Sequence, residues 1–254
     1  HISLKNNQKF VLYLGGGAMR GVFGAGVATK LEELNLYDKI EAVYGESSGS
    51  VVGAYFMTHQ VSFGAPMYYE ELADDNFMHL NNIPIAIYQI IKKRIFKSKT
   101  TNVRDILDIP FLFNIIKNKR PLDIEKLKNQ PIPFYIKLLN LKDCSIEYLD
   151  VRKVQDPFKA LSASVLVAPY SSLSENINGN EYIDGGLAQH IPIEDLKRRH
   201  PCCKIVFVFN AYPAFNIMQY LYDFLEGVFS VVLHGLKIFK IFLFQQHDFL
   251  NSVQ

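Results

Sequence analysis

The 254-residue sequence contains no tryptophan, only three cysteines and almost no excess charge of either sign. Cys144, Cys202 and Cys203 form neither the disulfide framework of a small secreted domain nor the spacing of a zinc site. Two of them are adjacent, which favours a reducing compartment. A formal net charge of +2 is too small to indicate a nucleic-acid-binding surface. We therefore expect no metal, no nucleic-acid partner, and a cytoplasmic or peripheral membrane location.

Long apolar runs are also missing. A membrane-spanning helix needs about 18 uninterrupted apolar residues, and the longest candidates, near the C-terminus, are broken by Asp223, Glu226, Lys237 and Lys240. The N-terminal lysines are not followed by the apolar region of a signal peptide. We expect neither a signal peptide nor a transmembrane segment in this chain. Because it begins with His1 rather than Met, we expect a fragment from which a targeting segment could have been removed.

The chain is rich in core-forming residues, since 49% of its residues are hydrophobic and 20% are charged. A chain of this length fits one large domain or two small ones. It contains no internal repeat and no low-complexity linker, so we expect a single domain over residues 1–254. Prolines interrupt the pattern of residues 66–123, which we expect to form an inserted helical cap. Residues 211–254 should form apolar C-terminal helices.

Apolar strands alternate with helical patterns near the N-terminus. Residues 10–14 form a continuous apolar run, as in a strand buried on both faces of a parallel sheet, and residues 42–44 form a second. A helix follows each strand, and the second helix covers residues 48–57. The core-facing stripe expected for the first helix consists of Phe23, Val27, Leu31 and Leu34. This β-α-β unit predicts an α/β fold: a three-layer α/β/α sandwich with a mainly parallel central sheet.

Regular patterns return in the second half of the chain. Asp156 and Pro157 are typical of the N-cap and first residue of a helix. Further elements complete the predicted fold: strands at residues 134–139, 145–149, 181–183 and 204–209, and a helix at residues 192–199.

The turn after the second predicted strand carries the pattern G-x-S-x-G, from Gly45 to Gly49, with Ser47 at its apex. Small residues on both sides of a serine let the backbone bend tightly and push the hydroxyl outward. That geometry suits a nucleophile that must reach a carbonyl carbon. Glycine and serine are common in ordinary turns, so the pattern becomes specific only in combination with others.

A glycine loop, defined here as residues 15–21, separates the first predicted strand from its helix. Consecutive glycines expose backbone N–H groups at a helix N-terminus, where a phosphate or an oxyanion can bind. The dinucleotide-binding pattern fails because Arg20 stands in its sixth position, and the P-loop pattern fails because no Gly-Lys-Ser/Thr follows. An oxyanion hole is the specific alternative to a glycine turn that serves packing alone.

The third pattern is Asp-Gly-Gly, which follows the predicted strand at residues 181–183. A carboxylate at a strand end followed by two glycines can approach another loop without side-chain obstruction. Taken alone, Asp184, Gly185 and Gly186 are more typical of an ordinary Asp-Gly turn.

In combination, the glycine loop, the G-x-S-x-G turn and the late Asp-Gly-Gly resemble the patatin-like phospholipase family. Residues 161–164, with Pro169, match the family's Ala-Ser…Pro segment, and residues 182–193 match the segment around its Asp-Gly motif. The resemblance covers roughly residues 9–57 and 156–210, in the order that the family has.

The resemblance implies a serine–aspartate dyad, in which Ser47 is the nucleophile and Asp184 its general base. The implied substrates are phospholipids or lysophospholipids at a peripheral membrane surface, with no cofactor, and the need for an activating protein partner is left open. The other implied site residues are the oxyanion-hole residues Gly15, Gly16, Gly17 and Ala18, and the supporting residues Arg20, Gly45, Gly49, Gly185 and Gly186.

Two other functions remain open at this point. An acyltransferase would share the acyl-Ser47 intermediate and pass the acyl group to an alcohol. A catalytically inactive lipid- or partner-binding module is suggested by Glu46, because the family usually has a small or β-branched neutral residue before the serine. A carboxylate there is costly beside a developing oxyanion unless it faces solvent or pairs with Arg20 or a lysine. A triad with His190 is rejected because only six residues separate it from Asp184.

Overall fold

The computed structural model describes residues 8–73, 77–85, 88, 92, 105–167, 170–171, 173–188 and 192–208. The C-terminal helices expected at residues 211–254 lie outside this part of the chain, as do Pro169 and His190. Within the described ranges, no helix is both long and apolar enough to cross a membrane. The elements are, in chain order, β1 (Phe10–Leu14), η1 (Ala18–Arg20), α1 (Gly21–Glu33), η2 (Tyr37–Lys39), β2 (Ile40–Gly45), α2 (Ser48–Met57), α3 (Val61–Gly64), α4 (Met67–Glu70), η3 (Leu80–Asn82), α6 (Ile109–Asn114), η4 (Ile115–Lys119), α7 (Ile124–Lys128), β3 (Phe134–Asn140), β4 (Ile146–Asp150), α8 (Pro157–Val165), β5 (Glu175–Ile177), β6 (Asn180–Asp184), η5 (Gly185–Ala188), α9 (Ile193–Arg199) and β7 (Lys204–Val208).

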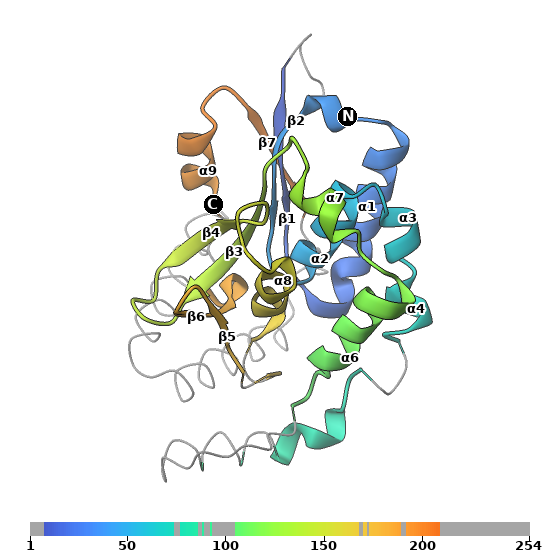
Figure 1. Cartoon of the computed structure of the whole chain (residues 1–254), viewed down its shortest axis with the longest axis vertical. Helices are drawn as coiled ribbons and strands as arrows, with labels where there is room; N and C mark the ends of the chain where they lie inside the picture. The colour runs from blue at the N-terminus through green and yellow to red at the C-terminus, as the bar shows by residue number, and fades with distance from the viewer. Residues whose placement is uncertain are drawn as a thin grey trace, which may run out of the picture.

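A central sheet organises these elements (Figure 1). Its strand order is β5-β6-β3-β2-β1-β7, and β4 also pairs with β3. The predicted parallel arrangement holds from β3 through β2 and β1 to β7. Strands β4, β6 and β5 pair antiparallel with their neighbours. The hairpins β3–β4 and β5–β6 are joined by short turns, which antiparallel strands alone allow, so the sheet is mixed.

Helices cover both faces of the sheet. In Figure 1, α1, α2 and α3 stand on one side and α9 stands on the opposite side. The main core fills the first face, where β1, β2 and β3 pack against α1, α2 and α8. On the second face, Leu196 of α9 is fully buried against Val11, Tyr13, Ala42 and Tyr44. The predicted three-layer α/β/α sandwich is therefore confirmed.

The helix α1 does not bury the stripe that its sequence predicted. Phe23, Val27 and Leu34 are 63%, 41% and 55% exposed, and Leu31 is the one member of the predicted stripe that is buried. The other buried residues of α1 are small: Gly21, Gly24, Ala25 and Ala28. A Cβ on Gly21 would lie 2.9 Å from the Ser48 Cβ, so α1 approaches α2 too closely for large side chains. The hydrophobic pattern missed this face because glycine and alanine add little to it.

The segment expected to form an inserted cap, residues 66–123, includes α4, η3, α6 and η4. Pro110 lies at the start of α6, where Asp108 caps the helix by accepting a hydrogen bond from the Phe111 N–H. Ile115 and Ile116 are fully buried in the main core, together with residues of β1 and β3. The described part of the segment thus packs into the body of the fold, and its action as a cap stays a prediction.

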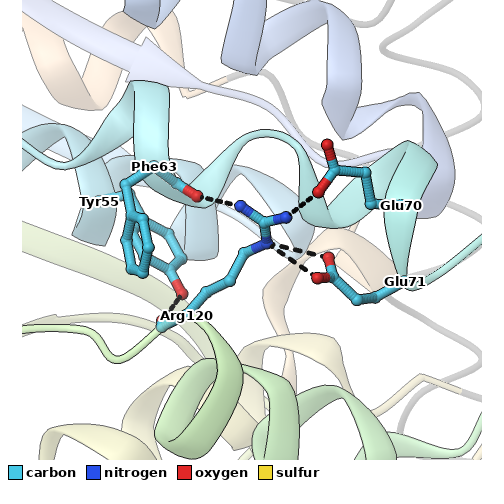
Figure 2. Close-up of polar contacts among 5 residues, drawn as sticks. All are labelled: Tyr55, Phe63, Glu70, Glu71 and Arg120. Atoms are coloured by element: carbon cyan, nitrogen blue, oxygen red, sulfur yellow. Dashed lines mark hydrogen bonds and ion pairs between the residues drawn. The ribbon is translucent and has the colours of Figure 1, made fainter.

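Arg120, at the end of η4, connects the C-terminal part of this segment to α4 at its start and to α3 before it (Figure 2). Its Nε donates to both carboxylate oxygens of Glu71 at 2.9 and 3.1 Å, and its Nη1 donates to the Phe63 carbonyl at 2.6 Å. A second ion pair joins Nη2 to Glu70. The Tyr55 hydroxyl donates to the Arg120 carbonyl at 2.5 Å. The guanidinium therefore joins two segments that are about 50 residues apart in the chain.

Arg120→Met is expected to lower the free energy of unfolding by about 3 kcal/mol, because Glu71 would be left partly buried without its cation. The Arg120 and Glu71 side chains are 12% and 14% exposed, so water replaces little of the lost interaction. Urea unfolding measures the change. Arg198→Met is the matched control, since that side chain is 80% exposed beside Asp195 and should cost less than about 1 kcal/mol. Equal losses in the two variants would contradict the expectation.

Candidate active site

A sharp turn follows β2 and presents Ser47. Its backbone has φ 52° and ψ −130°, a left-handed conformation that residues other than glycine rarely adopt. The turn is closed by hydrogen bonds from the Glu46 N–H to the Leu14 carbonyl at 3.0 Å and from the Gly49 N–H to the Glu46 carbonyl at 2.8 Å. Helix α2 begins at the next residue, Ser48. This strained strand–turn–helix geometry is that of a nucleophile elbow.

Close backbone approach explains two glycines of this region. A Cβ on Gly49 would lie 2.1 Å from the Leu14 carbonyl oxygen, at the end of β1. A Cβ on Gly16 would lie 2.7 Å from the Ser47 Cβ, so the glycine loop packs directly against the serine. The glycine loop and the elbow, predicted separately, are therefore in contact.

Asp184 reaches Ser47 because two strands meet end to end on one edge of β3. The other edge of β3 is occupied by β4, so β2 and β6 share the remaining one. On that edge Gly45, the last residue of β2, pairs with Ile136, and Asp184, the last residue of β6, pairs with Leu138. The carboxyl ends of β2 and β6 therefore face each other across Lys137.

The Asp184 side chain is enclosed, with 2% of the residue exposed. Its Oδ1 accepts a hydrogen bond from the Gly186 N–H at 2.8 Å. The Ser47 hydroxyl lies close enough to the carboxylate to favour its charged form. Burial, followed by the charge of Glu46, raises the pKa of Asp184 to about 7, although the Gly186 N–H, the Ser47 hydroxyl and the charge of Lys137 act in the opposite direction. A carboxyl with this pKa can take up a proton near neutral pH.

The backbone groups of the glycine loop differ in the hydrogen bonds that they form. The Gly15 N–H donates to the Val208 carbonyl at 2.9 Å, which ties the loop to β7. Gly17 has φ 142° and Ala18 has φ 48°, so the chain turns sharply before η1. The Arg20 Nε and N–H donate back to the Gly17 carbonyl at 3.3 and 3.0 Å. Arg20 thus bonds to its own loop rather than to Glu46.

Lys137, which no sequence motif identified, pairs with Glu46, the residue before Ser47, and interacts with Asp184. The side chain is 0% exposed, and its Nζ donates to Glu46 Oε2 at 2.6 Å. The Tyr13 hydroxyl donates to the same oxygen at 2.5 Å. Burial by itself would raise the pKa of Glu46, but Lys137, Tyr13 and the Gly16 N–H hold it below its usual value. A lysine between the apolar residues Ile136 and Leu138 of β3 was the signal that could have identified it.

In the described part of the chain, neither a histidine nor a metal-binding group is part of this site. The Asp184 carboxylate accepts the Gly186 N–H and lies beside Ser47, and His200 bonds instead to the Tyr44 hydroxyl on the other face of the sheet. Within the described part of the chain, no group of three histidine, cysteine, aspartate or glutamate side chains is placed to hold a metal ion.

Of the comparisons with known proteins, the family model supports the sequence resemblance. A search of curated protein sequences found no match. Among solved structures, the crystal structure of VipD from Legionella pneumophila matches with 13% sequence identity and a TM-score of 0.48. That match covers 87% of this chain and 53% of the VipD chain, so this chain spans about half the length of VipD. The family model of the patatin-like phospholipases matches residues 12–197, from β1 into α9, and the chain therefore belongs to the patatin-like phospholipase family.

Proposed function

We propose that this protein is a serine acyl hydrolase that cleaves ester bonds of phospholipids or lysophospholipids. The observation that carries the proposal is the position of Ser47, at the apex of a strained elbow, beside the buried carboxylate of Asp184. Membership of the patatin-like phospholipase family supports a lipid ester as the substrate. The nucleophile and the base both come from the protein.

Acylation begins when the Ser47 Oγ attacks the ester carbonyl carbon and its proton passes to Asp184. The tetrahedral intermediate collapses, the ester C–O bond breaks, and the alcohol leaves with the proton from Asp184. Water then attacks the acyl-serine and gives a proton to Asp184. Collapse of the second intermediate releases the fatty acid and returns that proton to Ser47. Asp184 therefore acts as base and acid in turn.

The negative oxygen of each intermediate needs N–H donors. We assign this role to Gly17 and Ala18, whose N–H groups donate no hydrogen bond to any described residue. The Gly15 N–H is bonded to Val208, and the Gly16 N–H favours the charged form of Glu46, so both N–H groups already have a role in the loop. Donors that are already oriented stabilise the oxyanion without reorganisation.

An apolar acyl chain bound at this site would exclude water and so make Asp184 a stronger base. Asp184 is already buried, and an acyl chain over the elbow would further disfavour the charged carboxylate. The Ser47 proton would then pass directly to a stronger base. A lipid is therefore a better substrate for the dyad than a small water-soluble ester.

A mass-spectrometric screen of mixed lipids tests the proposal, with Ser47→Ala as the blank. We expect fatty acid to appear with lysophospholipid or with a water-soluble glycerophosphoester, in the wild type alone. Transfer of the acyl group to an added lysolipid would identify the acyltransferase instead. Absence of any product from all lipid mixtures would favour the binding module and contradict the proposal. Excess chelator should leave the rate unchanged, because no step requires a metal.

A further inference from the structure

The buried ion pair between Lys137 and Glu46 lies directly beside the dyad. Lys137 is fully enclosed, Glu46 is 17% exposed, and Tyr13 donates to the same Glu46 oxygen as the ammonium group. Removing two charges from water is costly, and the surrounding protein recovers that cost only with good geometry and additional hydrogen bonds. Such a pair is weak evidence for stability, so its position at the site calls for a functional explanation.

The two carboxylates of the site converge on one residue. A Cβ placed on Gly186 would lie 3.1 Å from Asp184 Oδ1 and 3.3 Å from Glu46 Oε1. A Cβ placed on Gly185 would lie 2.8 Å from the Lys137 Cγ, so the lysine stem runs past the residue that follows Asp184. One cation therefore lies next to two carboxylates, and it is bonded to Glu46.

We propose that Glu46 is a positioning residue that binds Lys137 and so prevents the ammonium group from pairing with Asp184, which leaves Asp184 able to take the proton of Ser47. The inference rests on the proposed function, because it assigns Asp184 the role of base. The Gly16 N–H also favours the charged form of Glu46, so this carboxylate lies beside the glycine loop as well as beside Asp184.

The alternative pairing would disable the base. An ammonium ion bonded to Asp184 would stabilise the charged carboxylate and lower its pKa by about 1–3 units. It would also compete with the Ser47 hydroxyl for the same oxygens. In the observed arrangement the charge of Lys137 is largely neutralised by Glu46. Among the described residues, the ionisable groups that interact with Asp184 are Glu46 after β2, Lys137 on β3 and Tyr13 on β1. Tyr148 on β4 interacts with Glu46.

Opposite substitutions should shift the pH profile in opposite directions. We would measure the second-order rate constant with which an alkyl fluorophosphonate phosphonylates Ser47, from pH 4 to pH 9, using the full chain. In that reaction the serine oxygen bonds to phosphorus, fluoride leaves and the hydroxyl proton passes to Asp184. Glu46→Gln removes a negative charge and frees the ammonium group, so the acid limb should move down by at least about one pH unit. Lys137→Met should move it up by a similar amount.

The double variant Glu46→Gln with Lys137→Met restores the neutrality of the pair, and its acid limb should return to within about half a pH unit of the wild-type value. Glu41→Gln is the matched control on the same strand, because Glu41 pairs with Lys9 at the surface, where the two side chains are 40% and 52% exposed. Its profile should be unchanged. A purely structural role would lower the rate of both single variants without displacing their limbs in opposite directions.

A carbon-13 NMR titration of the Asp184 carboxyl separates this inference from the proposed function. The resonance is assigned by its loss in Asp184→Asn. If the wild type is never labelled at Ser47, the proposed function fails, whereas opposite displacements of the Asp184 titration would still support the role of Glu46. Displacements in one direction, or none, would overturn that role even in an active enzyme. Should one single variant fail to fold, the direction of the shift in the other still decides.

Discussion

Ser47→Ala is expected to lower kcat/KM for lipid ester hydrolysis at least about 10⁴-fold, because no acyl-enzyme can form without the serine oxygen. Covalent labelling by a fluorophosphonate should disappear entirely. The fold should be retained, since the substitution removes a single oxygen from a residue whose conformation is set by its neighbours. Labelling followed by intact-protein mass spectrometry, together with a continuous fatty-acid assay, measures both effects.

Ser48→Ala is the matched control for this prediction. The two serines are adjacent, but Ser48 is the first residue of α2 and is 6% exposed beneath the Tyr68 side chain. Its variant should retain labelling and activity within about tenfold of the wild type. Labelling that survives in Ser47→Ala and disappears in Ser48→Ala would show that Ser48, and not Ser47, is the nucleophile.

Asp184→Asn should lower kcat/KM by about 10²–10⁴-fold, the usual contribution of a general base, while raising stability at neutral pH. The native carboxyl has a pKa of about 7, against about 4 in the unfolded chain. The native state therefore binds the proton more tightly, and wild-type stability declines as the pH rises from about 4 to about 7. Asparagine stays neutral, so its variant should be more stable than the wild type at pH 8 by about 2–4 kcal/mol.

Urea unfolding at pH 5 and pH 8 measures the gain in stability, and the pH profile of hydrolysis measures the loss of activity. In the wild type the rate should fall about tenfold per pH unit below about pH 7, as the base becomes protonated. Asp150→Asn is the control with the opposite sign, because Arg152 bonds to Asp150 and holds its pKa below the usual range. That variant should lose stability at pH 8 and keep its activity. Wild-type rates in Asp184→Asn would disprove the dyad.

Elements that depend on local backbone requirements were predictable. The G-x-S-x-G turn and the glycine loop are recognisable in the sequence because a Cβ at Gly49 or Gly16 would collide with neighbouring atoms, which restricts these positions to glycine. The cap of α8 is another case: Asp156 accepts a hydrogen bond from the Phe158 N–H at 2.9 Å, as its position before Pro157 indicated. Such requirements act within a few residues and leave a readable pattern.

Predictions that relied on hydrophobic periodicity alone were less secure. Phe23 and Val27 follow a helical spacing, yet α1 buries its small residues, because its contact with α2 requires a short distance between the helices. The antiparallel strands beside β3 likewise follow from tertiary pairing and turn length. Neither choice is encoded in the periodicity of one element.

The sequence alone determined the α/β fold, the family and the two side chains proposed to carry the chemistry, since each depends on a short motif in a fixed order. The tertiary structure alone decided what surrounds Ser47. Glu46 became the partner of a buried lysine because β2 and β6 meet end to end on one edge of β3, with Lys137 between them. Glu46 and Lys137 are 91 residues apart in the chain. The register between distant strands sets their contact, so no local sequence pattern indicates it.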